Sequence, residues 1–523
     1  MTAVLLLVLV LPAAGGVAAA GLGRFSDRAG RIVAVVAAAG AFLASAALYW
    51  HRDAYGWFAY QPVRTGAPGP IAPWHQLDVS WAPGLQLRFH IGVDGISYPL
   101  VVLTTLLTLL CCVYTLWTVP AAGASGETPA RPRGALLAAL LLAIEVGILG
   151  VFLALNLVLF FVFFETVLLP MYAVIAVWGG PQRRAAARKF VLYTLFGSVL
   201  LLVGVFVVVA EAGTAELSQL TGGVGRRDYL TLGHGTQLAA FILLAVAFAV
   251  KSPLWPLHSW LPDAHTEAPT VGSVILAGVL LKMGTYGLLR VAVGVLPYGA
   301  RQVAPVLGVL AVAAIIVGGL VCLAQTELKR LIAYSSVGHM GFVLLGIATL
   351  TTTGFQAALI GNVAHGVITG LLFFLAGAVK DRAHTGDLTQ LGGLRERAPQ
   401  LSGLLGYAAI ASLGLPGLAG FWGEAFAVVA ALRHGGPLWT VLAVVAALGG
   451  ALAAAYFLRL LRQVTHGPVS PAVAGIATPR LAGAELLSWA PLVLLALAVG
   501  LVPALVLGVA HDPVQALGQV VGR

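Results

Sequence analysis

The sequence predicts an all-α polytopic membrane protein with about 14 transmembrane helices. Two observations support this fold class. Hydrophobic residues make up 60% of the 523-residue chain and charged residues only 9%, whereas a soluble domain carries roughly 25% charged residues. Apolar runs long enough to span a bilayer fill most of the chain, and they are continuous rather than alternating. Soluble, disordered, collagenous, disulfide-scaffold and β-barrel classes are therefore excluded.

The apolar runs and the breakers between them predict the individual helices in order. They lie near 3–21, 32–50, 96–119, 134–155, 157–178, 190–210, 237–260, 271–292, 303–323, 331–350, 355–379, 401–432, 437–461 and 485–510. The first run resembles a secretory signal but lacks its positive n-region, because the first charge is Arg24. We therefore expect a retained first helix.

Charged loops predict the orientation. The loop after the fifth run contains Arg183, Arg184, Arg188 and Lys189, and cytoplasmic loops carry the excess of Lys and Arg. Alternation then places both termini of this multi-pass protein outside. We expect the membrane to be a bacterial cell (inner) membrane. The formal net charge of +10 is explained in the same way, and no nucleic-acid partner is expected.

Four regions follow from the order of the runs. They are 1–133, a three-helix region with an outer loop at 51–95; 134–292, a five-helix unit; 303–464, a second five-helix unit; and 485–523, a helix and tail. The outer loop is rich in Trp, Tyr, His and Pro, which favours an interfacial cover. Because five is an odd number, the second unit enters the membrane from the opposite side, as an inverted repeat requires.

Two of the runs contain helix breakers. The seventh holds KSPLWP at 251–256, and the twelfth holds GLPG at 414–417. Proline removes a backbone donor, and a free backbone group at membrane depth is tolerated only beside protein or a watery cavity. Broken helices in corresponding positions of two halves are typical of transporters built from inverted repeats.

The chain shows no sequence sign of a cofactor of its own. Cys111, Cys112 and Cys322 all fall inside apolar runs, and no Cys-x-x-Cys pair occurs. Neither a dinucleotide-binding glycine motif nor a Walker loop is present. We therefore expect no metal, redox cofactor or nucleotide in this chain.

Ionisable residues inside the apolar runs are the candidate functional residues. They are Glu145, Glu165, Lys251, Lys282 and Glu424, together with His339 and His365. Each intramembrane charge costs roughly 2.5–3.5 kcal/mol, so such groups persist where they face one another or line a water path. Both cations are Lys, which releases a proton more readily than Arg. Static ion pairs between helices are the alternative interpretation, above all for Glu145.

Several segments resemble one known family. They are KSPLWPLHSWLPDAHTEAP at 251–269, GSVILAGVLLKMGTYG at 272–287, FFETVLLPM at 163–171, ELKRLIAYSSVGH at 327–339 and NVAH at 362–365. This set resembles the antiporter-like subunits of respiratory complex I and of multisubunit cation/proton antiporters. The resemblance implies fourteen helices, inverted five-helix repeats and broken helices 7 and 12.

The resemblance also implies roles for the buried residues. Glu165 and Lys251 match an ion pair, and Lys282 matches a central lysine. His339 and His365 match a polar relay. Glu424, at the end of GLPGLAGFWGE, matches the exit-side residue, where related chains commonly carry Lys. His258 and His265 match the signature without matching a relay position, and Glu145 matches nothing.

The implied function is proton translocation in NADH:quinone oxidoreductase. NADH, flavin, iron–sulfur clusters and quinone are then expected on partner subunits, and the partners are other membrane subunits, including neighbouring antiporter-like chains, and lipids. A subunit of a multisubunit sodium/proton antiporter remains an alternative. A structural subunit that pumps nothing is another.

Overall fold

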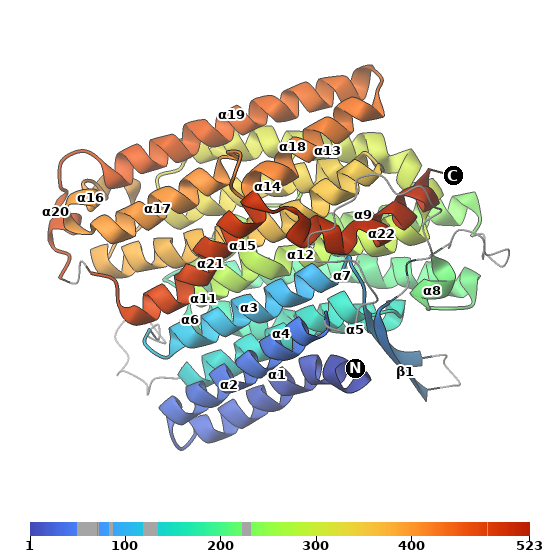
Figure 1. Cartoon of the computed structure of the whole chain (residues 1–523), viewed down its shortest axis with the longest axis horizontal. Coiled ribbons are helices and arrows are strands. Elements are labelled where there is room, and N and C mark those ends of the chain that lie inside the picture. The colour runs from blue at the N-terminus through green and yellow to red at the C-terminus, as the bar shows by residue number, and fades with distance from the viewer. Residues whose placement is uncertain are drawn as a thin grey trace.

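Long, nearly parallel helices form an elongated bundle, with both chain termini near the same end (Figure 1). The computed structural model describes residues 1–49, 71, 73–82, 87–118, 134–221, 232–477 and 480–522. The N-terminal region begins with α1 (Thr2–Gly23) and α2 (Asp27–Ala47), which pair along one edge of the bundle. The side chain of Ser26 caps α2 by accepting a hydrogen bond from the Ala29 amide. Helix α3 (Tyr98–Thr115) completes the region.

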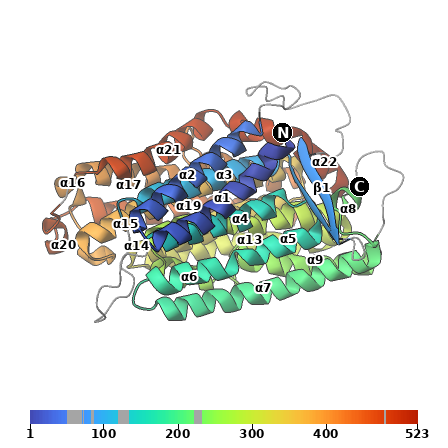
Figure 2. The ribbon, with the colours of Figure 1, turned by 90° about the horizontal axis from the view of Figure 1, so that it is seen from below.

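An antiparallel hairpin precedes α3. Strands β1 (His75–Ala82) and β2 (Leu87–Val93) pair with His75 opposite Val93. The sequence predicts an interfacial cover over 51–95; 51–70, 72 and 83–86 of that segment lie outside the described residues. The hairpin lies at the end of the bundle that also holds the termini, as Figure 2 shows. This end is called the hairpin end below.

Helices of the first five-helix unit follow the predicted runs but are subdivided. They are α4 (Gly134–Leu153), α5 (Leu157–Thr166), α6 (Leu168–Trp178), α7 (Arg183–Ala212), α8 (Leu217–Leu220), α9 (His234–Lys251), α10 (Trp260–Glu267), α11 (Thr270–Ile275), η2 (Leu276–Leu280), α12 (Leu281–Gly287) and η3 (Leu288–Val293). Helix α9 ends at Lys251, just before the first proline of the breaker. The eighth run contains two π-helical turns, η2 and η3, and such turns frequently occur at functional sites.

The rest of the chain is also helical. Its elements are α13 (Pro297–Ala324), α14 (Leu328–Ala348), α15 (Thr352–Ala383), η4 (Leu388–Gln390), α16 (Leu394–Arg397), α17 (Pro399–Ser412), α18 (Gly420–His434), α19 (Pro437–Thr465), α20 (Pro471–Ala474), α21 (Gly483–Leu501) and α22 (Ala504–Val521). The twelfth run is thus divided between α17 and α18 around the GLPG segment.

Within the described residues, 14 helices are long and apolar enough to cross a membrane. These 14 helices differ from the fourteen predicted runs by one replacement: the predicted run 401–432 is missing and α22 is added. Neither α17 nor α18 qualifies alone, whereas α22 does. The last predicted run, 485–510, is divided between two helices. Helix α21 ends at Leu501, and α22 begins at Ala504 after Pro503.

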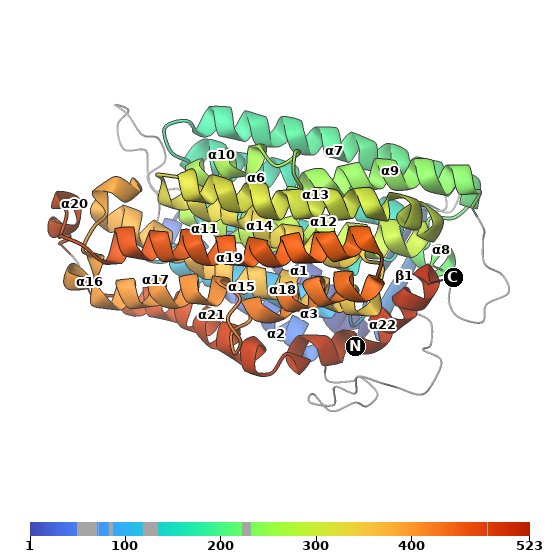
Figure 3. The ribbon, with the colours of Figure 1, turned by 90° about the horizontal axis from the view of Figure 1, so that it is seen from above.

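The bundle is most deeply buried around two central segments. In the most apolar 18-residue stretch of the α11–η3 segment (270–293), 100% of the stretch is buried, and in that of α15 the share is 94%. In Figure 3, α7 runs along one edge of the bundle and α21 along the opposite edge. Of the candidate residues, Lys282 and His365 lie on these two segments, and Glu145, Lys251, His339 and Glu424 lie on helices packed against them.

Candidate functional site

Lys282 and His365 form the central contact of the site. The Lys282 side chain, on α12, is 0% exposed. Its Nζ lies 2.7 Å from Nδ1 of His365 on α15 and donates a hydrogen bond to the Ala277 carbonyl at 2.5 Å. Two glycines permit this approach, because a Cβ on Gly366 would lie 2.6 Å from the Gly278 carbonyl oxygen.

Other polar groups surround this contact. The Thr285 hydroxyl donates to Oδ1 of Asn362 at 2.9 Å, so α12 and α15 are joined a second time. Nε2 of His365 is buried without a hydrogen-bond partner. His365 therefore has one engaged nitrogen and one nitrogen available for a further step.

His339 and Glu424 form a second contact. Nδ1 of His339, on α14, lies 2.7 Å from Oε1 of Glu424, on α18. Its other ring nitrogen lies 3.0 Å from the Ser412 hydroxyl and 3.4 Å from the Tyr456 hydroxyl. Glu424 is only partly buried, with its side chain 16% exposed. It is thus the better placed of the two to exchange a proton with water.

A small cavity joins the two contacts. The His339 and His365 rings are 6.1 Å apart between centroids, too far for a direct hydrogen bond. The cavity of about 30 Å³ between α14, α15 and α18 is lined by both histidines, Thr369, Ser412 and Glu424. A cavity of this size accommodates at least one water molecule. One bridging water would complete a path from Lys282 to Glu424.

Lys251 lies at the end of α9, beside the helix break. It is 2% exposed, and its Nζ lies 4.7 Å from the centre of the Phe164 ring. The next residue, Ser252, has a buried hydroxyl without a partner. That hydroxyl lies against α12, because a Cβ on Gly284 would lie 2.3 Å from it. Ser252 therefore stands between Lys251 and the helix that carries Lys282.

The predicted ion pair between Glu165 and Lys251 is not closed in this structure. The two residues interact electrostatically, but no salt bridge within 4.0 Å joins them among the described residues. Consecutive helical residues point about 100° apart, so Phe164 covers Lys251 while the half-buried Glu165 lies to one side. A change of side-chain conformation would be needed to bring the charges together.

Glu145 stands apart from these contacts. It lies on α4, is 0% exposed, and neither of its carboxylate oxygens has a hydrogen-bond partner. Cys112 on α3 is an electrostatic neighbour. No described hydrogen bond or ion pair connects Glu145 with Lys282 or Lys251, so the structure leaves it outside the path.

Two further residues, His265 and Lys329, belong to the site although the sequence analysis gives them no relay role. His265, on α10, is 0% exposed, stacks on Phe373 with ring centroids 4.4 Å apart, and has no partner for either ring nitrogen. Burial lowers the pKa of His265 well below its usual value, and Lys329 and Lys282 act in the same direction. Lys329 is 4% exposed and donates to the Ala268 carbonyl at 3.0 Å.

His258, the other histidine of the 251–269 segment, lies apart from the path. Its ring packs edge-on against Tyr334 with centroids 6.0 Å apart, and burial lowers its pKa. His265 differs because it is 0% exposed and both Lys329 and Lys282 act on it electrostatically. Its signal in the sequence is only its place in the LPDAH segment, which reads equally well as a loop.

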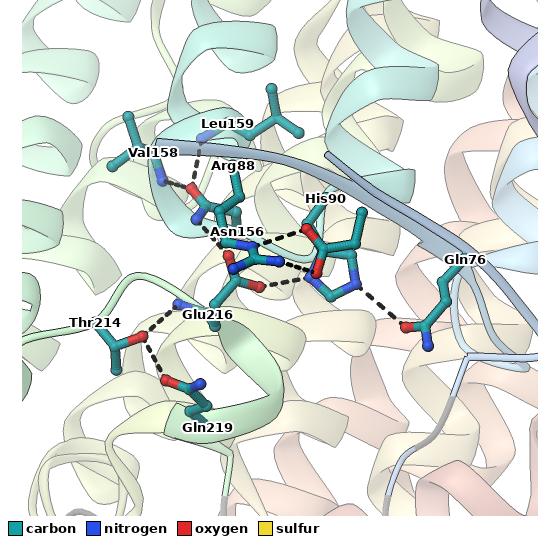
Figure 4. Close-up of polar contacts among 10 residues, drawn as sticks. Gln76, Arg88, His90, Asn156, Val158, Leu159, Thr214, Glu216 and Gln219 are labelled. Carbon is teal, nitrogen blue, oxygen red and sulfur yellow. Dashed lines mark hydrogen bonds and ion pairs between the residues drawn. The ribbon is translucent and has the colours of Figure 1, made fainter. Parts of the chain in front are cut away.

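A separate polar cluster ties the hairpin to the bundle (Figure 4). Glu216 lies between His90 and Asn156: one oxygen is 2.5 Å from Nδ1 of His90, and the other accepts from the Asn156 amide at 2.8 Å. Nε2 of His90 lies 3.2 Å from the Gln76 side-chain oxygen. This cluster is at the hairpin end and makes no described contact with Lys282 or Glu424.

Comparison with known proteins gives a consistent result. Residues 154–449 match the family described as NADH:quinone oxidoreductase/Mrp antiporter, transmembrane. The chain is 39% identical over 495 residues to NADH-quinone oxidoreductase subunit M of Rhodobacter capsulatus, covering 93% of this chain and 90% of that protein.

Two solved structures share the fold. A chain of respiratory complex I from Thermus thermophilus with bound NADH is 30% identical with a TM-score of 0.83, covering 99% of this chain and 100% of that one. A chain of the Mrp complex from Dietzia sp. DQ12-45-1b is 22% identical with a TM-score of 0.79, covering 100% and 99%; at this identity the likeness concerns the fold alone.

Proposed function

Because the chain belongs to the NADH:quinone oxidoreductase/Mrp antiporter family, we propose that it translocates protons in the membrane arm of an NADH:quinone oxidoreductase. The redox chemistry, with NADH, flavin, iron–sulfur clusters and quinone, is placed on partner subunits. Other membrane subunits, including antiporter-like neighbours, and lipids are the partners. The chain is thus a non-redox subunit of a translocase.

One observation carries this proposal. Lys282 contacts His365, His339 contacts Glu424, and a cavity large enough for one water is lined by His365, His339 and Glu424. Together they form a chain of groups that accept and release protons, buried in the centre of the bundle. A static scaffold would not need four titratable groups on four different helices, three of them lining one cavity.

The proposed path begins on the cytoplasmic side. Lys329 and His265 would deliver a proton toward Lys282, and Lys251 would exchange one with Lys282 through the Ser252 hydroxyl. From Lys282 the proton would pass to His365, His339 and Glu424. We place Glu424 toward the outside, in the orientation that the Arg-rich loop after α6 favours.

The switch in this proposal is the Glu165–Lys251 pair. When Glu165 is close, it holds Lys251 charged; when it turns away, as in this structure, the lone cation is costly and gives up its proton. A proton-motive force of about 150–200 mV opposes each transferred charge with roughly 3.5–4.6 kcal/mol. Breaking one buried pair costs a comparable 3–5 kcal/mol or so, so a single switched pair suffices for one proton.

The sodium/proton antiporter is the alternative, and a simple experiment separates it. The assembled complex is reconstituted in proteoliposomes, and NADH-driven ΔpH is followed in buffers with and without Na⁺. The proposal predicts the same ΔpH in both, with no effect of a sodium ionophore. A ΔpH that requires Na⁺ and collapses with the ionophore would favour sodium exchange. The inverted relationship of 134–292 and 303–464 is part of the same proposal.

A further inference from the structure

Arg290 is a buried cation that the proposed path does not use. It lies in η3 and is 3% exposed; its Nη2 lies 2.9 Å from Oδ2 of Asp94, which is 2% exposed. Its Nε and Nη1 atoms are buried without a hydrogen-bond partner. A fully desolvated guanidinium with two unused donors is costly, so its presence at this position requires a reason.

The position of Arg290 relative to Lys282 supplies one. Lys282, Tyr286 and Arg290 follow at intervals of four residues along one continuous segment, which runs from the centre of the bundle toward the hairpin end. The Tyr286 hydroxyl donates to the Phe152 carbonyl at 3.1 Å, and Tyr286 interacts electrostatically with both Arg290 and Asp94. On the face of this segment that carries Lys282, Tyr286 and then Arg290 follow toward the hairpin end, whereas the Thr285 hydroxyl is bonded to Asn362 on α15.

Further ionisable groups lie beyond Arg290. Asp94 directly follows β2, and the same strand carries His90, which pairs with Glu216 in the cluster of Figure 4. A line of polar groups thus leads from Lys282 to the hairpin end through the first five-helix unit. It is distinct from the path through His365, and a proton following it would bypass His339 and Glu424.

Arg290 interrupts this line chemically. A proton relay needs groups that accept a proton and release it, whereas a guanidinium has only donors and keeps its charge. A fixed arginine also sets up an electrostatic barrier to protons, as it does in water pores. Asp94 is not free either: its Oδ2 faces Arg290, and its Oδ1 accepts the amide hydrogens of Ile96 at 2.9 Å and Ser97 at 3.0 Å.

We propose that Arg290 and Asp94 form a seal that closes the route from Lys282 to the hairpin end, so that a proton held at Lys282 leaves only through His365. This inference rests on the proposed function, because a seal is needed only where Lys282 carries protons. Without Arg290, Asp94 would become a carboxylate with a free oxygen, able to take up a proton and to pass it outward.

The test measures passive proton flow, with no NADH present. Proteoliposomes containing the assembled complex receive a potassium diffusion potential, and the internal pH is followed with a dye. Arg290→Gln should raise the proton conductance about tenfold, equivalent to about 1.4 kcal/mol. Conductance at the wild-type level in Arg290→Gln would overturn the proposal.

A matched double variant separates the seal from a packing defect. Asp94→Asn with Arg290→Gln also lacks the ion pair, but Asn keeps the oxygen that caps Ile96 and Ser97 and cannot take up a proton. The proposal predicts that the passive proton conductance of this double variant equals that of the wild type. A double variant that leaks as much as Arg290→Gln would show a structural defect and would overturn the proposal.

Two further measurements keep the inference testable. If Arg290→Gln does not assemble, Arg290→Lys is tested instead, because it retains a cation that can release its proton. Its passive proton conductance should exceed that of the wild type. A conductance at the wild-type level would overturn the proposal. The proposed function fails in a different assay, through undiminished NADH-driven pumping by Lys282→Gln. The passive leak without NADH therefore reports on the seal separately.

Discussion

Lys282 and His365 lie 83 positions apart in the sequence, yet Nζ of one and Nδ1 of the other are 2.7 Å apart. The contact depends on small residues: Gly278 and Gly366 bring η2 and α15 close enough for the lysine to reach the ring. At the next step, a similar approach of Gly423 to Gly361 brings α18 against α15 and places Glu424 beside His339. Close backbone packing thus builds both contacts.

Lys251→Ala should strongly reduce pumping while the complex still assembles, because the mid-membrane cation next to the helix break is lost. Lys251→Arg is the matched variant: it keeps the charge but does not release a proton, so it should fail as well. The measurement is ΔpH formation in proteoliposomes with NADH and quinone. Normal pumping by either assembled variant would count against a titrating role for Lys251.

Glu165→Gln should impair pumping more than Glu145→Gln does. Glu165 interacts with Lys251, whereas Glu145 has no partner for either oxygen and no described link to the path. Both are single carboxylate-to-amide changes of equal size, so each serves as the control for the other. Equal, mild effects on the ratio of protons to NADH would remove Glu165 from the switch.

Glu424→Gln should abolish proton release at the end of the path, whereas Glu424→Lys should retain a measurable part of it. The reason is that the position lies against His339 and is partly exposed, so any group that takes up and releases a proton there can serve. ΔpH formation is compared after assembly has been checked. Full pumping by Glu424→Gln would leave the exit unassigned.

His265 should make the stability of the complex pH-dependent. Burial holds its pKa well below the usual value, so the folded chain keeps it neutral while the unfolded chain protonates it below about pH 6.5. Above that pH, His265 is neutral in both states and does not lower the free energy of unfolding. As the pH falls below it, the free energy of unfolding decreases by up to about 1.4 kcal/mol per pH unit. The measurement is the thermal unfolding midpoint at about pH 7.5 and pH 5.5.

His265→Gln supplies the control for that measurement. Glutamine is of similar size and does not titrate, so the difference between the two midpoints should be smaller in the variant than in the wild type. An equal difference in both proteins would show that other groups set the pH dependence.

Much of the site follows from the sequence because of one physical rule. Charges inside long apolar runs are costly, so the few that occur are the candidate functional positions. Lys282, His365, His339 and Glu424 are selected in this way; the structure brings them into two contacts, and the last three line one cavity. The helical class and the membrane-spanning character follow from composition and run length alone.

Other features depend on long-range packing and leave little local signal. His265 lies in a proline-rich segment typical of a loop, and its enclosure comes from Phe373 on α15. The π-helical turns around Lys282 shift the register without interrupting the apolar run. The distance between Glu165 and Lys251 depends on side-chain rotation, which the motif does not specify. The hairpin is obscured by the Pro-rich segment that precedes it.

The central claim is that protons cross through Lys282, and the most direct measurement is the number of protons pumped per NADH oxidised by Lys282→Gln. The control is Lys189→Gln, which changes a lysine that pairs with Asp263 outside the path. We expect a strongly lowered ratio in Lys282→Gln, with assembly and NADH oxidation by an artificial acceptor retained, and a normal ratio in the control. A wild-type ratio in Lys282→Gln would contradict the account and favour a purely structural subunit.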